Sequence, residues 1–390
     1  MNDRPELPGL LYSEAEDDLR AAVRALLTAR ADPGELPARV ETDGAYDPAL
    51  WTALAADMGA AGLLVPEKLG GQGATHREAA VVLEELGRAV TPVPYLTSAV
   101  VATETLLAAG AGDLAGELAT GRRVAVLAVP LSTGPGHEPA ASAPAATEPS
   151  AAKPATEPTA TEPATAAPAA GGPVSGVADA SRADVLLVVR PDGLYAVDAA
   201  EATLTPATPL DLTRPLATVT AHGAGTRLAD AATARDAVRA GLLAGAGLLA
   251  SEQLGVAEWC LEEAVRHTRE RHQFNRPVGS FQALKHRMAQ LWLEVVQARA
   301  AARNAAGALA AGSPDAPLAV ALAQVHCSRV AVHAAEECVQ LHGGVGMTWE
   351  HPVHLYLKRA KADQIAFGSP GRHKETLARL VNLPGPVTTG

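Results

Sequence analysis

The amino-acid sequence predicts a mainly α-helical protein with a small β domain between two helical domains. Its 390 residues suggest two or three domains. Hydrophobic residues make up 48% of the chain, which is enough for a large core, whereas aromatic residues make up only 3%. Alanine, the strongest helix former, is abundant. Apolar residues recur at helical spacing towards both ends of the chain, and short β-type runs occupy the middle, so the domain order is helices, strands, helices.

The first domain is predicted over residues 1–121. Leu19 and Val23 share one helical face with the residues that follow, and Leu83 and Leu86 mark a second amphipathic helix. The glycine-rich stretch Gly70–Gly73 separates these helices. Thr75 is a suitable N-cap for the second one, because its hydroxyl can accept a hydrogen bond from a free backbone N–H group.

The second domain is predicted over residues 122–229 as a small antiparallel β domain with Gly and Pro between its strands. It contains the segment Pro130–Pro173, which is almost wholly Ala, Pro, Thr, Glu and Gly and repeats Thr-Glu-Pro three times. Such a composition cannot bury enough apolar surface to offset chain entropy, so we expect a disordered insertion. The predicted strands are Val124–Val129, Val185–Val189, Leu194–Val197 and Leu216–Thr220.

The third domain is predicted over residues 230–385 as an antiparallel helical bundle. Three apolar stripes repeat at steps of three and four residues, as expected for long helices that pack on one another. The first stripe runs from Leu254 to Thr268, the second from Leu284 to Ala298, and the third from Leu318 through Leu322 to Val339.

Composition also excludes several classes of protein. The net charge of −11 argues against nucleic acid as the main partner, because phosphate binding needs a basic surface. The three cysteines are odd in number and contain no Cys-x-x-Cys pair, so we expect neither a disulfide framework nor a structural zinc site. The longest apolar run, Ala240–Ala250, is too short to span a bilayer. With no hydrophobic segment at the N-terminus, we expect a cytoplasmic protein.

Two motifs carry candidate chemistry. The stretch Arg271–Gln282 joins two helices and combines a guanidinium suited to phosphate contact with an apolar ring at Phe274. The stretch Gln340–Thr348 places a Gly-rich turn after a long helix, where backbone N–H groups can approach a ligand closely. Taken singly, the same residues also suit a plain helical corner and a plain helix C-cap.

Together, and in this domain order, the motifs resemble the acyl-CoA dehydrogenase family. The resemblance extends to the N-terminal part through Pro66-Glu67, Gly70–Gly73 and Glu85-Leu86-Gly87. It implies an N-terminal helical domain, a middle β-barrel-like domain and a C-terminal four-helix bundle. It also implies FAD as cofactor, an acyl-CoA thioester as substrate and an electron-transfer acceptor. Because the family shares its flavin site between subunits, a homo- or hetero-oligomer is implied.

The resemblance also implies site residues. The family's contacts with the flavin of a neighbouring subunit fall here on residues of the two motifs, and we add the serine that follows the expected base position. The implied cofactor contacts are Arg271, Phe274, Gln282, Gln340, Gly343, Gly344 and Ser369.

The sequence departs from the family where the catalytic base is expected. The reaction needs a group that removes the α-proton of the thioester while the β-hydrogen leaves as hydride. The family's usual base position is occupied by Phe367, and the alternative position on an earlier helix falls near Gly245. Glu252, two helical turns after Gly245 on the same face, is the candidate for a displaced base. A structural role for Glu252 remains open.

Three functional alternatives follow. The first is an FAD-dependent acyl-CoA dehydrogenase with a displaced base. The second is a base-less subunit that supports a catalytic paralogue, as the ending Trp349–Leu357 suggests for relatives that form heteromers. The third is a flavin oxidase or monooxygenase with the same fold. The histidines between His326 and His354 have no carboxylate at a matching sequence spacing, so no metal site is expected.

Overall fold

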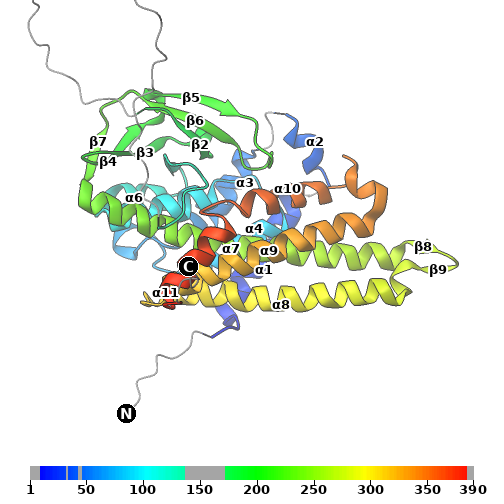
Figure 1. Cartoon of the computed structure of the whole chain (residues 1–390). Coiled ribbons are helices and arrows are strands. Elements are labelled where there is room, and N and C mark those ends of the chain that lie inside the picture. The colour runs from blue at the N-terminus through cyan, green and yellow to red at the C-terminus, as the bar shows by residue number, and fades with distance from the viewer. Residues whose placement is uncertain (1–8, 32–33, 43–45, 137–171, 384–390) are drawn as a thin grey trace, which may run out of the picture.

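The computed structural model describes residues 9–31, 34–42, 46–136 and 172–383. Helical domains lie at both ends of the chain and the strands lie between them in sequence (Figure 1), which confirms the predicted fold class. The three-domain division itself stays a prediction. The elements nevertheless change type close to its boundaries, because α6 ends at Ala119, β1 begins at Ala125 and α7 begins at Ala231.

The N-terminal helices begin at well-formed caps. Helix α1 (Glu14–Arg30) begins after Ser13 and helix α4 (His76–Arg88) after Thr75, and each cap is a reciprocal capping box with a glutamate three residues on. The Thr75 cap is as predicted. The shorter helices are α2 (Leu36–Val40), α3 (Pro48–Thr52), α5 (Thr103–Ala108) and α6 (Gly112–Ala119), with π-helical segments at Ala53–Asp57 and Tyr95–Ala102 and 3-10 turns at Ala60–Gly62 and Glu67–Leu69.

The β region forms two sheets. One has strand order β1-β3-β4-β7 and the other β2-β6-β5. The strands are β1 (Ala125–Leu127), β2 (Val174–Ala178), β3 (Val185–Arg190), β4 (Gly193–Asp198), β5 (Ala202–Ala207), β6 (Leu216–Ala221) and β7 (Thr226–Asp230). The prediction of a purely antiparallel domain is wrong, because β1 pairs with β3 in parallel. Strands β2, β5 and β7 were not predicted. The sequences of β5 and β7 are polar and their residues are largely exposed.

The predicted start of the disordered insertion is also wrong. Leu131 donates its N–H to the carbonyl of Gly176 at 2.9 Å, and its own carbonyl accepts the N–H of Phe367 at 2.7 Å. Residues 130–136 therefore belong to the folded core region, because a distant part of the chain provides their hydrogen-bond partners. The remainder of the predicted insertion, 137–171, lies outside the described residues.

The C-terminal domain is built on three long helices that run side by side (Figure 1). Helix α7 is buried along most of its length, so it forms the centre of the molecule. A short hairpin joins α7 to α8 at the end away from the sheets. The elements are α7 (Ala231–Glu270), β8 (His272–Gln273), β9 (Arg276–Pro277), α8 (Gln282–Ala310), α9 (Ala316–His342), α10 (Val353–Asp363) and α11 (Pro370–Leu380), with 3-10 turns at Val278–Ser280 and Gly343–Met347.

The third predicted apolar stripe is partly wrong. Leu322 is 49% exposed, whereas Ala323, Cys327 and Ala331 are buried. Helix α9 packs against α7 and α8 through its small side chains, because these allow close approach of the helix backbones. The larger leucine is left at the margin of the contact.

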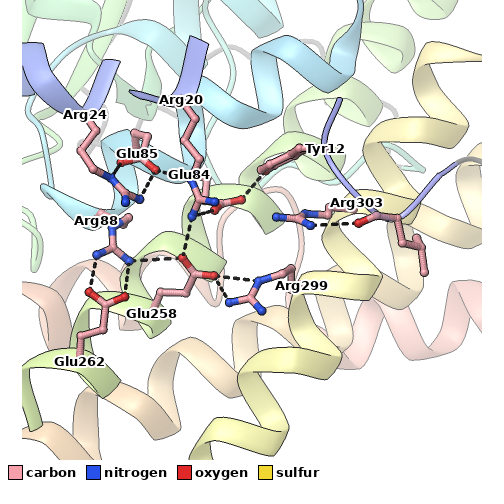
Figure 2. A network of polar contacts seen from close by, with 11 residues as sticks. Tyr12, Arg20, Arg24, Glu84, Glu85, Arg88, Glu258, Glu262, Arg299 and Arg303 are labelled. Atoms are coloured by element: carbon pink, nitrogen blue, oxygen red, sulfur yellow. Dashed lines mark hydrogen bonds and ion pairs between the residues drawn. The ribbon is translucent and has the colours of Figure 1, made fainter. Parts of the chain in front are cut away.

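A close crossing joins α4 to α7. A Cβ atom at Gly255 would lie 1.9 Å from the carbonyl oxygen of Glu84, and one at Gly87 would lie 2.1 Å from that of Glu252. Only glycine permits this approach. The crossing brings acidic side chains of α4 and α7 together with arginines of α1 and α8 (Figure 2).

The resulting polar network connects the N-terminal helices to the bundle. Arg20 bridges Glu84 and Glu85 of α4, and Arg299 of α8 reaches Glu258 of α7 (Figure 2). Burial, together with the charge of Glu258, raises the pKa of Glu84 to about 7. The network contains Tyr12, Arg20, Arg24, Glu84, Glu85, Arg88, Glu258, Glu262, Arg299 and Arg303.

Two helical stretches are long and apolar enough to cross a membrane, Ala231–Glu270 and Ala316–Met347. Their apolar windows are 89% and 67% buried within the fold. Because core helices of this kind pass the same test, the finding is weak evidence for a membrane span.

Candidate functional site

The two residues at the expected base positions, Gly245 and Phe367, lie against each other in the centre of the molecule. Gly245 lies on α7, and Phe367 follows α10. A Cβ atom at Gly245 would lie 3.0 Å from Cζ of Phe367 and 2.6 Å from Cγ2 of Val101. The phenyl ring therefore occupies the space beside Gly245, and we call this region the central chamber.

The backbone of Phe367 is held in a fixed position. Its φ of 52° lies in the left-handed region, which is unusual for a bulky residue. Its N–H donates to the carbonyl of Leu131 at 2.7 Å, and its carbonyl lies 3.1 Å from Nε2 of His373. These contacts from two separate segments offset the conformational cost and direct the ring into the chamber.

Among the described residues, only a small cavity lies beside Phe367. The cavity beside Phe367 has a volume of about 20 Å³, close to the minimum for one water molecule. None of the described residues that line it carries a carboxylate or an imidazole. The lining consists of Thr97, Val101, Val126, Leu127, Val129, Pro130, Leu131, Ala178, Leu242 and Phe367.

Glu252 lies in a buried ion-pair cluster. It is 2% exposed, and Arg214 donates to its two carboxylate oxygens at 2.7 and 2.8 Å. Arg359 of α10 contacts the same carboxylate. Two guanidinium groups therefore donate hydrogen bonds to the carboxylate that the sequence offers as a displaced base.

The same cluster contains two further carboxylates. Arg359 also contacts Asp211, and Arg214 also contacts Asp363, so two cations face three acidic side chains. Burial raises the pKa of Asp363 to about 7; Glu252 adds to this effect and Arg214 opposes it. A proton on Asp363 would balance the charges of the cluster. The sequence shows no local pattern for this cluster, because its members come from the β5–β6 connection, α7 and α10.

A larger hollow lies at the far end of the bundle, beside the β8–β9 hairpin. Its volume is about 500 Å³. We call it the bundle-end hollow, and four of the predicted cofactor contacts line it: Arg271, Gln340, Gly343 and Gly344. The two sequence motifs, almost 70 residues apart in the chain, therefore meet in one place.

The geometry of the bundle-end hollow suits an extended anionic ligand. Arg271 is exposed, and its guanidinium has no hydrogen-bond or ion-pair partner among the described residues. Cβ atoms at Gly343 and Gly344 would have no heavy atom within 4 Å, so the backbone of this turn faces open space. A free guanidinium beside an open glycine turn can contact phosphate oxygens.

The remaining predicted contacts do not line this hollow. Phe274 lies at the tip of the hairpin, is 85% exposed and has a φ of 53°. Gln282 is the first residue of α8 and lies within 3.5 Å of His286. Ser369 caps α11 near the central chamber, where its hydroxyl accepts the N–H of Arg372.

Although no carboxylate stands at a matching sequence spacing, one lies beside two of the histidines in space. Glu263 of α7 lies 3.3 Å from Nε2 of His342 and 3.2 Å from Nε2 of His351. The three ligand atoms lie within 4.8 Å of one another. Sequence spacing could not reveal this group, because the carboxylate comes from a different helix.

Comparisons with known proteins agree with the geometry. Residues 13–115 match the family model of the acyl-CoA dehydrogenase N-terminal domain, and residues 211–381 match that of the C-terminal domain. The chain is 34% identical over 368 residues to acyl-CoA dehydrogenase IpdE2 of Mycolicibacterium smegmatis, which covers 94% of this chain and 98% of that protein. It is 30% identical over 376 residues to acyl-CoA dehydrogenase FadE27 of Mycobacterium tuberculosis, covering 91% and 94%.

One solved structure with the same fold is a chain of a two-protein complex. The fold matches a chain of the ChsE4–ChsE5 complex from Mycobacterium tuberculosis with a TM-score of 0.80 and 25% identity, covering 97% of this chain and 100% of that one. From the two family models and the near full-length relatives, we conclude that the chain belongs to the acyl-CoA dehydrogenase family of oxidoreductases.

Proposed function

We propose that this chain is a base-less subunit of a heteromeric acyl-CoA dehydrogenase. In this proposal its bundle-end hollow contributes to a flavin site whose acyl-CoA chamber belongs to a paralogous subunit. The observation that carries the proposal is the contact between Phe367 and Gly245. The aromatic ring at one expected base position fills the space beside the other. A positioned general base is worth about 10²–10⁴-fold in rate.

The distance between the two regions supports a shared site. Gly245 lies 25 residues before Glu270, the last residue of α7, and Arg271 directly follows that end; 25 residues of helix correspond to about 38 Å at 1.5 Å per residue. Residues of the bundle-end hollow therefore cannot serve the central chamber of their own chain. They can serve the chamber of a neighbouring subunit, and the likeness to the ChsE4–ChsE5 complex supports a paralogue in that place.

FAD, when bound, would supply the hydride acceptor of the reaction. In this chain Arg271 would hold its phosphates and Gln340 would offer its amide. The turn at Gly343 and Gly344 would admit the ligand to the backbone. Phe274 would provide an exposed apolar ring at the edge of the partner subunit.

A displaced base at Glu252 is the alternative. Its contacts with Arg214 and Arg359 weigh against it, because both oxygens of this buried carboxylate already accept hydrogen bonds from guanidinium groups. No feature of the described residues favours a flavin oxidase or monooxygenase over a dehydrogenase.

The test compares the chain alone with its complex with a paralogous subunit of the same genome. We expect the chain alone to hold little FAD and to show no acyl-CoA-dependent reduction of an artificial electron acceptor, whereas the complex holds FAD and is active. In the complex, Arg271→Ala should lower bound flavin. The control is Arg235→Ala, an exposed arginine at the opposite end of α7.

Two results would overturn the proposal. One is full FAD loading and strong dehydrogenation by the chain alone. The other is unchanged flavin content in the Arg271→Ala complex. Strong activity of the chain alone that disappears in Glu252→Gln would instead establish the displaced base.

A further inference from the structure

We propose that Glu263 is a positioning residue that closes the glycine-rich turn of the bundle-end hollow by accepting hydrogen bonds from both of its ends. Only the expected consequence of this arrangement, which is the retention of flavin, rests on the proposed function. The arrangement itself stands on the contacts of Glu263, His342 and His351 and can be tested without flavin.

The carboxylate of Glu263 joins the two ends of one segment. His342 is the last residue of α9 and immediately precedes Gly343, and His351 ends the connection that leads to α10. The two Nε2 atoms lie 3.3 and 3.2 Å from the same oxygen, Oε1 of Glu263. One side chain of α7 therefore fixes both the start and the end of the segment 343–350.

Hydrogen-bond partners assign the protons on the two rings. Nδ1 of His342 lies 2.7 Å from the carbonyl of Cys338, so it must carry a proton, and Nε2 faces a carboxylate and carries another. His342 is thus an imidazolium. Nδ1 of His351 accepts the N–H of Val353 at 3.3 Å, so its proton sits on Nε2 and points to Glu263.

The charges around His342 agree with this assignment. Burial alone would lower its pKa, but the hydrogen bonds to Cys338 and Glu263 outweigh burial and raise the pKa to about 10. The hydrogen bonds from both histidines and Arg266 likewise outweigh burial at Glu263 and hold its pKa far below the usual range. The groups in contact with His342 are Glu263 and His267 of α7, Cys338 of α9, and His351 before α10. Behind them, Cys260 contacts Cys338 and Arg266 contacts Glu263.

Hydrogen bonds explain these contacts better than a metal ion does. The spacing of the three ligand atoms would suit a tetrahedral ion. However, Arg266 already donates to both oxygens of Glu263, and the N–H of Val353 points at the ring nitrogen that would need a proton in a metal complex. A proton network satisfies every one of these atoms.

The arrangement also connects to the wall of the bundle-end hollow. His267 stacks on His342 with ring centroids 4.1 Å apart, and both line the hollow together with Gly343 and Gly344. Burial first, and then the charge of His342, lower the pKa of His267, which leaves it neutral. Without Glu263, His342 and His351 lose their common acceptor, and the open glycine turn loses its fixed shape.

The first experiment observes the histidines directly. In the full chain labelled with ¹⁵N-histidine, the signal of His342, identified by its loss in His342→Gln, should report protons on both nitrogens at about pH 8, where an ordinary histidine is neutral. In Glu263→Gln the same signal should titrate at least about one pH unit lower. Glu336→Gln, an exposed glutamate of α9, is the control and should leave it unchanged.

The second experiment measures flavin retention in the complex with the paralogous subunit. Glu263→Gln should weaken FAD retention by roughly 10-fold, which corresponds to about 1.4 kcal/mol. His351→Ala should weaken it too, whereas His351→Gln, whose amide can still donate to Glu263, should retain most of it. Rescue by the glutamine distinguishes positioning from a general loss of stability.

Several outcomes would overturn the inference. A neutral His342 at about pH 8 in the wild type would contradict the proton assignment. So would one equivalent of tightly bound Zn²⁺ that is lost in Glu263→Gln and His351→Ala. If Arg271→Ala lowers flavin retention and Glu263→Gln does not, the positioning role of Glu263 is wrong and the proposed function stands. If Arg271→Ala has no effect while His342 behaves as expected, the proposed function fails and the closure of the turn stands.

Discussion

The central chamber and the bundle-end hollow differ in what surrounds their glycines. A side chain at Gly245 would collide with Phe367 and Val101, whereas one at Gly344 would meet open space. The first region is packed like a protein core. The second leaves a free arginine and an open backbone turn at the surface. Within one chain of a flavoenzyme family, the part expected to surround the reacting atoms is therefore closed, and the part that we propose to face a neighbouring subunit is open.

The largest effect is expected from breaking the buried ion-pair cluster around Glu252. Arg359→Met leaves Asp211 and Glu252 without one of their cations, and an uncompensated buried charge costs about 3–5 kcal/mol. Urea denaturation measures the loss. Glu252→Gln, which keeps the shape of the side chain, should also destabilise the chain. If it left stability intact and removed an existing dehydrogenase activity, Glu252 would be a base and not a structural residue.

The two glycines provide the sharpest comparison. Gly245→Ala should destabilise the chain by about 1–3 kcal/mol through overpacking. Gly344→Ala should leave the thermal midpoint unchanged and lower flavin retention in the complex. Phe367→Ala should partly relieve the clash of Gly245→Ala, so that the double variant is more stable than the sum of the single effects. Strictly additive effects would mean that Phe367 and Gly245 do not share one space.

The pH dependence of stability distinguishes the buried carboxylates. Because the pKa of Asp363 is raised from 3.8 to about 7, the folded chain holds a proton that the unfolded chain releases. This contribution is fully present below about pH 4 and is lost as the pH rises to about 7; a shift of about three pKa units corresponds to at most about 4 kcal/mol. Asp363→Asn should flatten that part of the profile. If the thermal midpoint of Asp363→Asn fell as steeply between pH 4 and 7 as that of the wild type, Asp363 would not hold the proton.

The smallest effect is expected outside both regions. Replacing residues 137–171 by a short Gly/Ser linker should lower the thermal midpoint by less than roughly 5 °C, because the sequence of this segment contains almost no large apolar residue. Extending the replacement back to residue 130 should cost more, since it removes the hydrogen bond between Leu131 and Phe367. Equal midpoints for the two replacements would show that this contact contributes little.

Local patterns in the sequence were sufficient for the order of the elements and for one half of the candidate site. The Thr75 cap and the long helices of the bundle follow from residues close together in the chain. The same holds for the motifs around Arg271 and Gly344, which reach the same hollow because they end neighbouring helices. The exposed face of α9 at Leu322 was not predictable, since small residues form its close contact with α7 and α8.

The sequence by itself determined the helix–strand–helix order, the family motifs and the presence of Phe367 and Gly245 at the expected base positions, because each is a property of residue type and local spacing. Only the tertiary structure decided that these two residues fill one space, that two arginines engage Glu252, and that Glu263 joins His342 to His351. Each of these contacts joins side chains from different elements. Their distances depend on how the helices cross, which no spacing along the chain records.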